Sequence, residues 1–181
     1  MDPAGEPLIG MPSESYHELG DRDLQAIIAY LQQMEPVDNP LPPTTVKTMG
    51  YLLIGAGEID VTANVVHSTE HPTAVPVAAT VEYGAYLYDT ACKDCHRPHL
   101  QGGPHPDPAG PAVPSLQRAS TRPYEAVKRA ITEGTSIDGR RLNDKWMPWS
   151  AFSHMTDEEI RALYRFLQRR ASNEGEPSSS Q

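Results

Sequence analysis

The chain has 181 residues, of which 18 are proline and 38% are apolar, and its formal net charge is −9. This composition favours a small helical domain with long loops over one large core, and no apolar run reaches the about 18 residues of a membrane span. Residues 1–81 hold 11 acidic and 2 basic residues, which argues against nucleic acid as a partner because its phosphates bind Lys and Arg.

The first predicted helix covers residues 21–34, where apolar side chains recur at helical spacing and form one face, made of Leu24, Ile27, Ile28 and Leu31. Residues 37–80 are predicted as a linker, because this region opens with a proline-rich sequence, PVDNPLPP, that cannot hold a helix. Within the linker, a weakly apolar piece from Met49 to Ile59 fits either a turn of helix or a packed strand, and the pattern does not decide between them.

Three more helices are predicted in the second half of the chain. A short helix over residues 82–91 leads into the two cysteines, and another over residues 123–133 starts at a proline and ends before a glycine. The last helix, over residues 157–169, follows a capping box in which Thr156 and Glu159 bind the backbone of the first turn.

An internal repeat relates the first and last of these helices at an offset of 136 residues. The sequence MPSESYHELGDRDLQAIIAYLQ begins at Met11, and MPWSAFSHMTDEEIRALYRFLQ begins at Met147. The Met-Pro pair and its spacing to the helix agree, and a short piece upstream matches with a two-residue gap, GEPL at 5–8 against GRRL at 139–142. A chance match of two amphipathic helices would not bring all of these features, so shared ancestry is the better interpretation.

Cys92, Cys95 and His96 form the most specific motif of the chain, the haem attachment pattern CxxCH. Two thiols separated by two residues on a turn can form thioethers to both vinyl groups of one porphyrin, and the next residue then lies beneath the iron as an axial ligand. Two alternatives share the CxxC spacing. A thioredoxin-like site expects a preceding strand, whereas a helix is predicted here, and a zinc site needs four ligands although no second CxxC occurs.

The second axial position on the iron is predicted to be filled by Met147, which lies 51 residues after His96 in the sequence WMPW. A thioether ligand favours Fe(II) and leaves no room for a substrate. Met155 and His154 are rivals for this position. A core role suits Met155 better, because it matches the apolar Leu19 in the repeat.

Together these residues resemble the class I cytochromes c, and more narrowly the mono- and dihaem cytochromes that serve membrane-bound bacterial dehydrogenases and oxidases. Besides CKDCH, WMPW and the last helix, the matching pieces are Gly84, Tyr88, LQGG at 100–103, VPSL at 113–116 and DGRRL at 138–142. The resemblance implies an all-α fold, the class I cytochrome c fold, in which a small helical domain with long loops surrounds one haem c. It also implies that the first and last helices of the domain cross at Gly84, so that Gly84 and Tyr88 meet Leu163 and Phe166.

Around the haem, the resemblance implies that the backbone carbonyl of Pro114 accepts a hydrogen bond from His96 Nδ1 and so orients the ring. Arginine pairs well with carboxylates, so the residues considered as partners of the haem propionates are Arg118, Arg122, Arg140, Arg141 and Trp146. The last three are favoured as a group because they lie in the loop before Met147. Any single arginine of this set is more often a solvated surface residue.

The domain boundaries expected from the resemblance leave the beginning of the chain incomplete. Residues 1–36 are interpreted as the C-terminal remnant of an upstream cytochrome c domain, 37–80 as a linker, 81–171 as a complete domain and 172–181 as a disordered tail. Dihaem members carry a first CxxCH ahead of the first Met-Pro, and none precedes Met11. Either the chain is a fragment or the first haem site was lost, and a fragment is simpler because so short a remnant cannot bury its own apolar face.

The resemblance implies an electron carrier and not an enzyme. It would pass electrons between a dehydrogenase or respiratory donor and an oxidase or other acceptor, in the periplasm or at the outer face of the bacterial cytoplasmic membrane. The full-length protein would then carry an export signal or a membrane anchor. Two alternatives remain: a haem enzyme or gas sensor with an open iron position, such as a peroxidase, and a structural domain that uses haem only for folding.

Overall fold

The computed structural model describes residues 16–39, 45–58 and 75–174 of the chain. The chain divides into two compact units, residues 1–74 and 75–181, and each is described by itself. The first methionine of the repeat, Met11, lies outside the described residues, as does the GEPL piece upstream of it.

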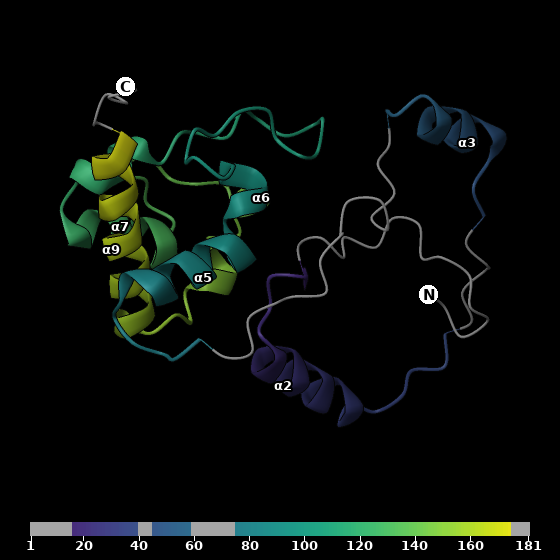
Figure 1. Cartoon of the computed structure of the whole chain (residues 1–181), viewed down its shortest axis with the longest axis horizontal. Coiled ribbons are helices and arrows are strands. Elements are labelled where there is room, and N and C mark those ends of the chain that lie inside the picture. Colours follow the sequence, from purple (N-terminus) through teal and green to yellow (C-terminus); the bar gives the residue numbers. More distant parts are fainter. Residues whose placement is uncertain (1–15, 40–44, 59–74, 175–181) are drawn as a thin grey trace, which may run out of the picture. The chain divides into compact units, whose positions relative to one another are not determined.

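The first unit contains helix α2 (Asp21–Gln32) and helix α3 (Thr48–Gly55) (Figure 1). The helix predicted over residues 21–34 is therefore confirmed, and α3 shows that the weakly apolar piece after Met49 is helical and not a strand. Neither helix buries a side chain, although both carry large apolar residues, among them Leu24, Leu31 and Tyr51.

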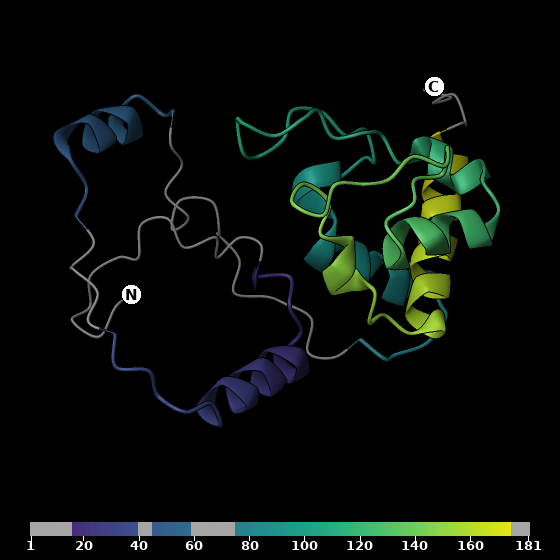
Figure 2. The same cartoon turned by 180° about the vertical axis from the view of Figure 1, so that it is seen from behind.

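The second unit is a small helical domain, and the part of it that the structure describes contains no β-strand apart from two isolated bridges. Figures 1 and 2 show α9 running along the domain, with α5 crossing it and α7 beside it. The all-α fold predicted for this region is confirmed. Its elements are α5 (Val81–Ala91), α6 (Lys93–His96), the 3-10 helix η1 (Gln117–Thr121), α7 (Tyr124–Thr132), α8 (Trp149–Phe152) and α9 (Asp157–Glu174).

Helix α9 begins with the predicted capping box. The backbone N–H of Glu159 donates to Thr156 Oγ1 at 3.3 Å, and the backbone N–H of Thr156 donates to Glu159 Oε2 at 2.6 Å. These bonds satisfy backbone donors that the first turn of a helix leaves without partners. At its other end α9 runs past the predicted end at residue 169 and into the predicted tail.

The crossing of α5 and α9 depends on Gly84. A Cβ atom at this position would lie 2.0 Å from the backbone oxygen of Ala162 and 2.9 Å from the Cβ of Phe166. One turn further along α5, the rings of Tyr88 and Phe166 meet with their centroids 5.1 Å apart, and Leu163 belongs to the same buried cluster. The close approach expected at Gly84 is therefore present, and its nearest neighbour is Ala162.

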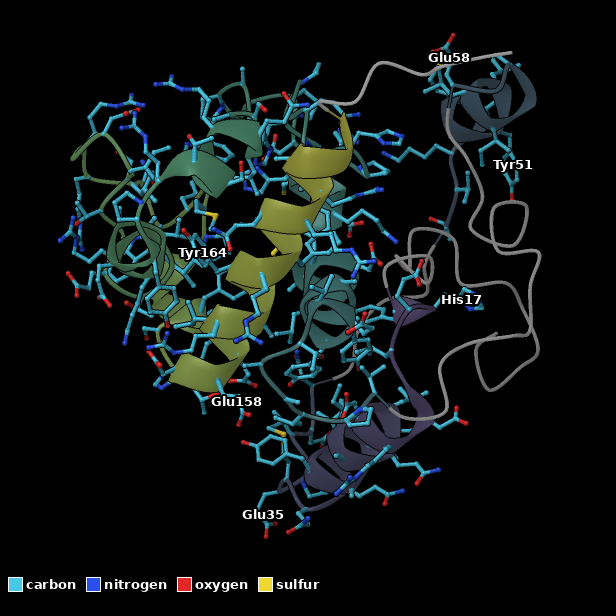
Figure 3. All side chains as sticks on the ribbon, turned by 60° about the vertical axis from the view of Figure 1, so that its left-hand side comes forward. His17, Glu35, Tyr51, Glu58, Glu158 and Tyr164 are labelled. Carbon is cyan, nitrogen blue, oxygen red and sulfur yellow. The ribbon has the colours of Figure 1, made fainter. Side chains whose placement is uncertain are left out.

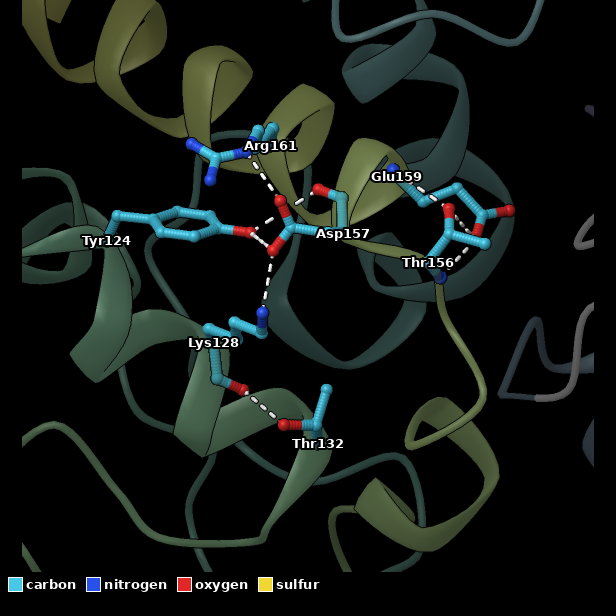
Figure 4. Close-up of polar contacts among 7 residues, drawn as sticks. All are labelled: Tyr124, Lys128, Thr132, Thr156, Asp157, Glu159 and Arg161. Atoms are coloured by element: carbon cyan, nitrogen blue, oxygen red, sulfur yellow. Dashed lines mark hydrogen bonds and ion pairs between the residues drawn. The ribbon is translucent and has the colours of Figure 1, made fainter.

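A carboxylate at the start of α9 ties this helix to α7 (Figure 4). Asp157 accepts hydrogen bonds from Tyr124 Oη at 2.7 Å, Lys128 Nζ at 2.6 Å and Arg161 Nε at 2.6 Å. These donors hold the pKa of the Asp157 carboxyl well below its usual range, the bond from Lys128 having the largest effect. The sequence indicated the capping box here but not this three-donor cluster.

A second link runs from α9 to the segment before α7. Tyr164, labelled in Figure 3, reaches from α9 and donates its hydroxyl hydrogen to the backbone oxygen of Arg122 at 2.8 Å. Its ring also meets Tyr124 edge to face, with the centroids 5.5 Å apart. α9 is therefore packed on one side by α5 and fixed on another by the start of α7.

Candidate functional site

The two cysteines lie on one helical turn directly after α5. Cys92 follows the last residue of that helix and precedes α6, and the backbone N–H of His96 donates to the oxygen of Cys92 at 2.9 Å. Both thiols are free and partly buried. The turn therefore places Cys92, Cys95 and His96 in the compact arrangement that the CxxCH spacing predicts.

The chain after His96 is held in an unusual backbone conformation. Arg97 and Leu100 both have positive φ angles, 66° and 59°, in the region that L-residues seldom adopt. Tyr88 Oη donates to the oxygen of Arg97 at 2.5 Å, and Leu100 is completely buried. Burial raises the pKa of Tyr88, so its hydroxyl stays protonated and keeps donating. These contacts fix the reversal of the chain behind His96.

His96 is buried and its orientation is set by Pro114. The distance from His96 Nδ1 to the backbone oxygen of Pro114 is 3.1 Å, so the hydrogen bond expected from the family resemblance is present. A carbonyl oxygen only accepts, which requires the proton to be on Nδ1 and leaves the lone pair on Nε2. Burial lowers the pKa of His96 and favours the neutral ring that a metal needs.

Gly102 lets the two segments around His96 approach each other. Its φ angle is +68°, and a Cβ atom there would lie 2.3 Å from the oxygen of Val113 and 2.8 Å from the oxygen of Pro114. The backbone N–H of Gly102 also donates to the oxygen of His96 at 3.1 Å. A glycine is required at this position because both the backbone conformation and the available space exclude a side chain.

The surroundings of the thiols can be compared with what the two alternatives to haem attachment, a thioredoxin-like site and a zinc site, would need. Burial, with smaller effects from Cys95 and Asp89, raises the pKa of the Cys92 thiol to about 12, and burial raises that of Cys95 as well. A thioredoxin-like site needs a lowered thiol pKa, so these surroundings oppose that interpretation. Within the described ranges, no three His, Cys, Asp or Glu side chains are grouped as a metal-binding set.

Met147 and its rivals differ in their surroundings. Met155 packs against the main buried cluster of the domain, as predicted for a core residue, and His154 is exposed. Met147 is partly buried but is not among the partly buried apolar residues that pack against that cluster. Its backbone N–H donates to the oxygen of Asn143 at 3.0 Å, which fixes the start of the Met-Pro segment. Of the three side chains, Met147 is the one that is partly buried and is not packed against the main buried cluster.

Trp149 was not singled out by the sequence, yet its indole occupies a defined place beside Gly134. A Cβ atom at Gly134 would lie 2.5–2.6 Å from atoms of the indole, and the guanidinium carbon of Arg141 is 4.3 Å from the ring centroid. The indole nitrogen, Nε1, is buried and has no hydrogen-bond partner in the structure. The only sequence signal for this contact is the glycine that ends α7.

The residues considered for the propionates do not share one environment. Arg141 stacks on Trp149, while Trp146 meets the ring of His105, with centroids 5.1 Å apart, and the ammonium of Lys145 at 4.3 Å. Arg140 is exposed. The other two arginines face Asp138, at 4.0 Å from Arg118 and 3.3 Å from Arg122.

Comparison with known proteins gives one match. A family model described as cytochrome c covers residues 81–171, about half of the chain and nearly all of the second unit. No curated protein and no solved structure matches the chain. The matched range begins with α5 and includes the CxxCH turn, Met147 and α9. The residues present fit a covalent haem, since two thiols, an oriented imidazole and a buried N–H without an acceptor lie in this range.

Proposed function

The chain belongs to the cytochrome c family and carries a haem c bound covalently through Cys92 and Cys95. We propose that His96 and Met147 are the axial ligands of its iron. The protein is then an electron carrier whose iron is coordinated on both sides by the chain. The observation that carries the proposal is the hydrogen bond from Nδ1 of buried His96 to Pro114, which leaves Nε2 free to bind the iron.

The haem, when bound, supplies a one-electron Fe(III)/Fe(II) couple. The chain holds it with two thioethers on one turn and keeps His96 in a single tautomer and orientation through Pro114. Tyr88 holds the backbone directly after His96, and Gly102 allows the close approach to Pro114, so these residues would keep the imidazole in a fixed position toward a bound iron. A thioether from Met147 favours Fe(II) and raises the reduction potential.

The test of this ligation is the spectrum of the reduced protein with and without carbon monoxide. If the thioether of Met147 occupies the second axial position, carbon monoxide leaves the spectrum of the dithionite-reduced protein unchanged. An immediate shift of the haem bands would contradict the proposal and favour a haem enzyme or gas sensor with an open iron position. The same sample, denatured and then tested, provides the control, since unfolding releases Met147 and the spectrum should then respond.

The proposal extends to location and partners. Thioether attachment in bacterial members of the family is carried out on the outer side of the cytoplasmic membrane, so we place the protein in the periplasm or at that face, where it exchanges electrons with other redox proteins. No helix among the described residues is long and apolar enough to cross a membrane. Fractionation of source cells tests the location: haem-bearing chain confined to the cytoplasm would contradict it.

We further propose that residues 1–36 are the last part of an earlier cytochrome c domain. The support is the repeat, together with the exposure of every large apolar residue on α2. The native polypeptide should then contain, ahead of Met11, a second CxxCH whose histidine precedes Met11 by 51 residues, as His96 precedes Met147. The haem content of protein purified from its source tests this: two haems per polypeptide are expected, and one would indicate that the first site was lost.

A further inference from the structure

The indole of Trp149 is fixed next to the segment that carries Met147. Trp149 is the first residue of α8, and its backbone N–H donates to the oxygen of Met147 at 2.7 Å. Trp149 therefore lies two positions after the proposed axial ligand and is hydrogen-bonded to its backbone.

Two neighbours restrict the position of the indole. Gly134, at a φ angle of +63°, leaves just enough space for the ring, because a Cβ atom would lie 2.6 Å from the indole nitrogen itself. Arg141 places its guanidinium 4.3 Å from the ring centroid and also donates to the backbone oxygen of Glu133. The ring is thus held by the end of α7 and by the loop before Met147, and Arg141 adds a positive charge beside it.

The indole N–H lacks an acceptor although it is buried. Among the side chains that the structure describes, only two buried nitrogens have no hydrogen-bond partner, Trp149 Nε1 and Arg170 Nε. Buried donors are nearly always paired in folded proteins, and an indole N–H can only donate. None of the described residues accepts a bond from this N–H, and the cofactor of the domain offers two acceptors, because a haem carries two propionate carboxylates.

We propose that Trp149 Nε1–H donates a hydrogen bond to a haem propionate, with Gly134 and Arg141 holding the indole in place. The inference rests on the proposed function, because it requires haem on the Met147 side of the domain. It assigns to Trp149 the role that the sequence suggested for Trp146, whose ring contacts His105 and Lys145 instead. Trp149 acts as a positioning residue: it neither binds iron nor carries the electron.

The first experiment compares Trp149→Phe with Trp146→Phe, since both variants keep an aromatic ring and lose an indole N–H. Without its donor, the propionate keeps more negative charge near the iron, which stabilises Fe(III). Trp149→Phe should lower the reduction potential and shift the propionate bending band in the resonance Raman spectrum. Trp146→Phe should move neither. Equal behaviour of the two variants, or no change in Trp149→Phe, would overturn the inference.

A second experiment uses the unmutated protein, so that it does not depend on the folding of a variant. In the reduced, diamagnetic state, the indole proton of Trp149 should show a nuclear Overhauser contact to the methylene protons of a propionate. If only Trp146 shows this contact, or if neither does, the inference is wrong. A carbon monoxide test distinguishes failure of this inference from failure of the proposed ligation. The spectrum of reduced Trp149→Phe should not change with carbon monoxide. A change in the spectrum of the unmutated protein would mean that Met147 does not bind the iron.

Discussion

Helices α2 and α9 have related sequences, but their side chains have opposite environments. In α9, Ile160 and Ala162 are 1% and 0% exposed, whereas in α2 the matching Leu24 is 38% exposed and Ala26 is also exposed. Both helices were predicted from local sequence, α2 from its apolar spacing and α9 from its capping box, and both are present. Local signals therefore predict each helix, but not whether its apolar face is covered.

The difference lies in the partner helix. The α9 face is covered by α5, and the two backbones come together where Gly84 meets the oxygen of Ala162. Burial of Ala26 in the same way would require a similar glycine-bearing helix against α2. If α2 and α9 are copies of one helix, as the proposed repeat implies, each contributes half of an interface. In the second unit, the other half comes from α5, which leads into the haem motif.

The largest effect on residues 75–181 is expected from removing their covalent cofactor. The double variant Cys92→Ala, Cys95→Ala should contain no haem that survives denaturation. Residues 75–181 should also lose their cooperative unfolding transition, because a cofactor that binds only the folded state stabilises it. Mass spectrometry and far-ultraviolet circular dichroism measure the two effects. Haem retained through denaturation, or an unchanged transition, would contradict the assignment.

A smaller loss of stability is expected from a change at the crossing of α5 and α9. Ala162→Leu places a larger side chain where α9 meets Gly84, and overpacking of this kind should lower the free energy of unfolding by about 1–3 kcal/mol or more. The matched variant Ala26→Leu, at the equivalent position of α2, should change it by less than about 0.5 kcal/mol. Denaturant titration of both haem-bearing proteins measures the difference. Comparable losses would mean that α2 is covered as α9 is.

The smallest loss of stability is expected from a change of Asp157, the first residue of α9. Asp157→Ala removes the acceptor of the three-donor cluster, whereas Asp21→Ala changes the equivalent residue of α2. Because the pKa of Asp157 is lower in the folded than in the unfolded state, its stabilisation is present above about pH 4 and is lost as the pH falls further. Asp157→Ala should therefore lower Tm slightly at pH 7.

This decrease should shrink in high salt, since exposed ion pairs are screened, and should disappear in acid. Asp21→Ala is the control and should leave the Tm of residues 75–181 unchanged at every pH. A loss that is equal at pH 7 and at low pH would show that Asp157 acts only through packing.

Much of the fold could be predicted because it depends on local signals. Helical spacing predicts α2, a starting proline and an ending glycine predict α7, and the Thr156–Glu159 pair predicts the start of α9. The hydrogen bond from His96 to Pro114 followed from the family resemblance and is present. The partners of Asp157 and Trp149 could not be predicted, because they lie on other elements and depend on how the loops return.

We propose that Met147 binds the iron and that Met11, its counterpart in the proposed repeat, does not. The most direct measurement is the reduction potential of the purified protein compared with that of Met147→Ala and Met11→Ala. Met147→Ala should lower the potential by on the order of 0.2 V, a fraction of the ~0.8 V range that axial ligands span, and should let the reduced protein bind carbon monoxide. Met11→Ala should change neither property. A potential that falls in Met11→Ala and not in Met147→Ala would contradict the account.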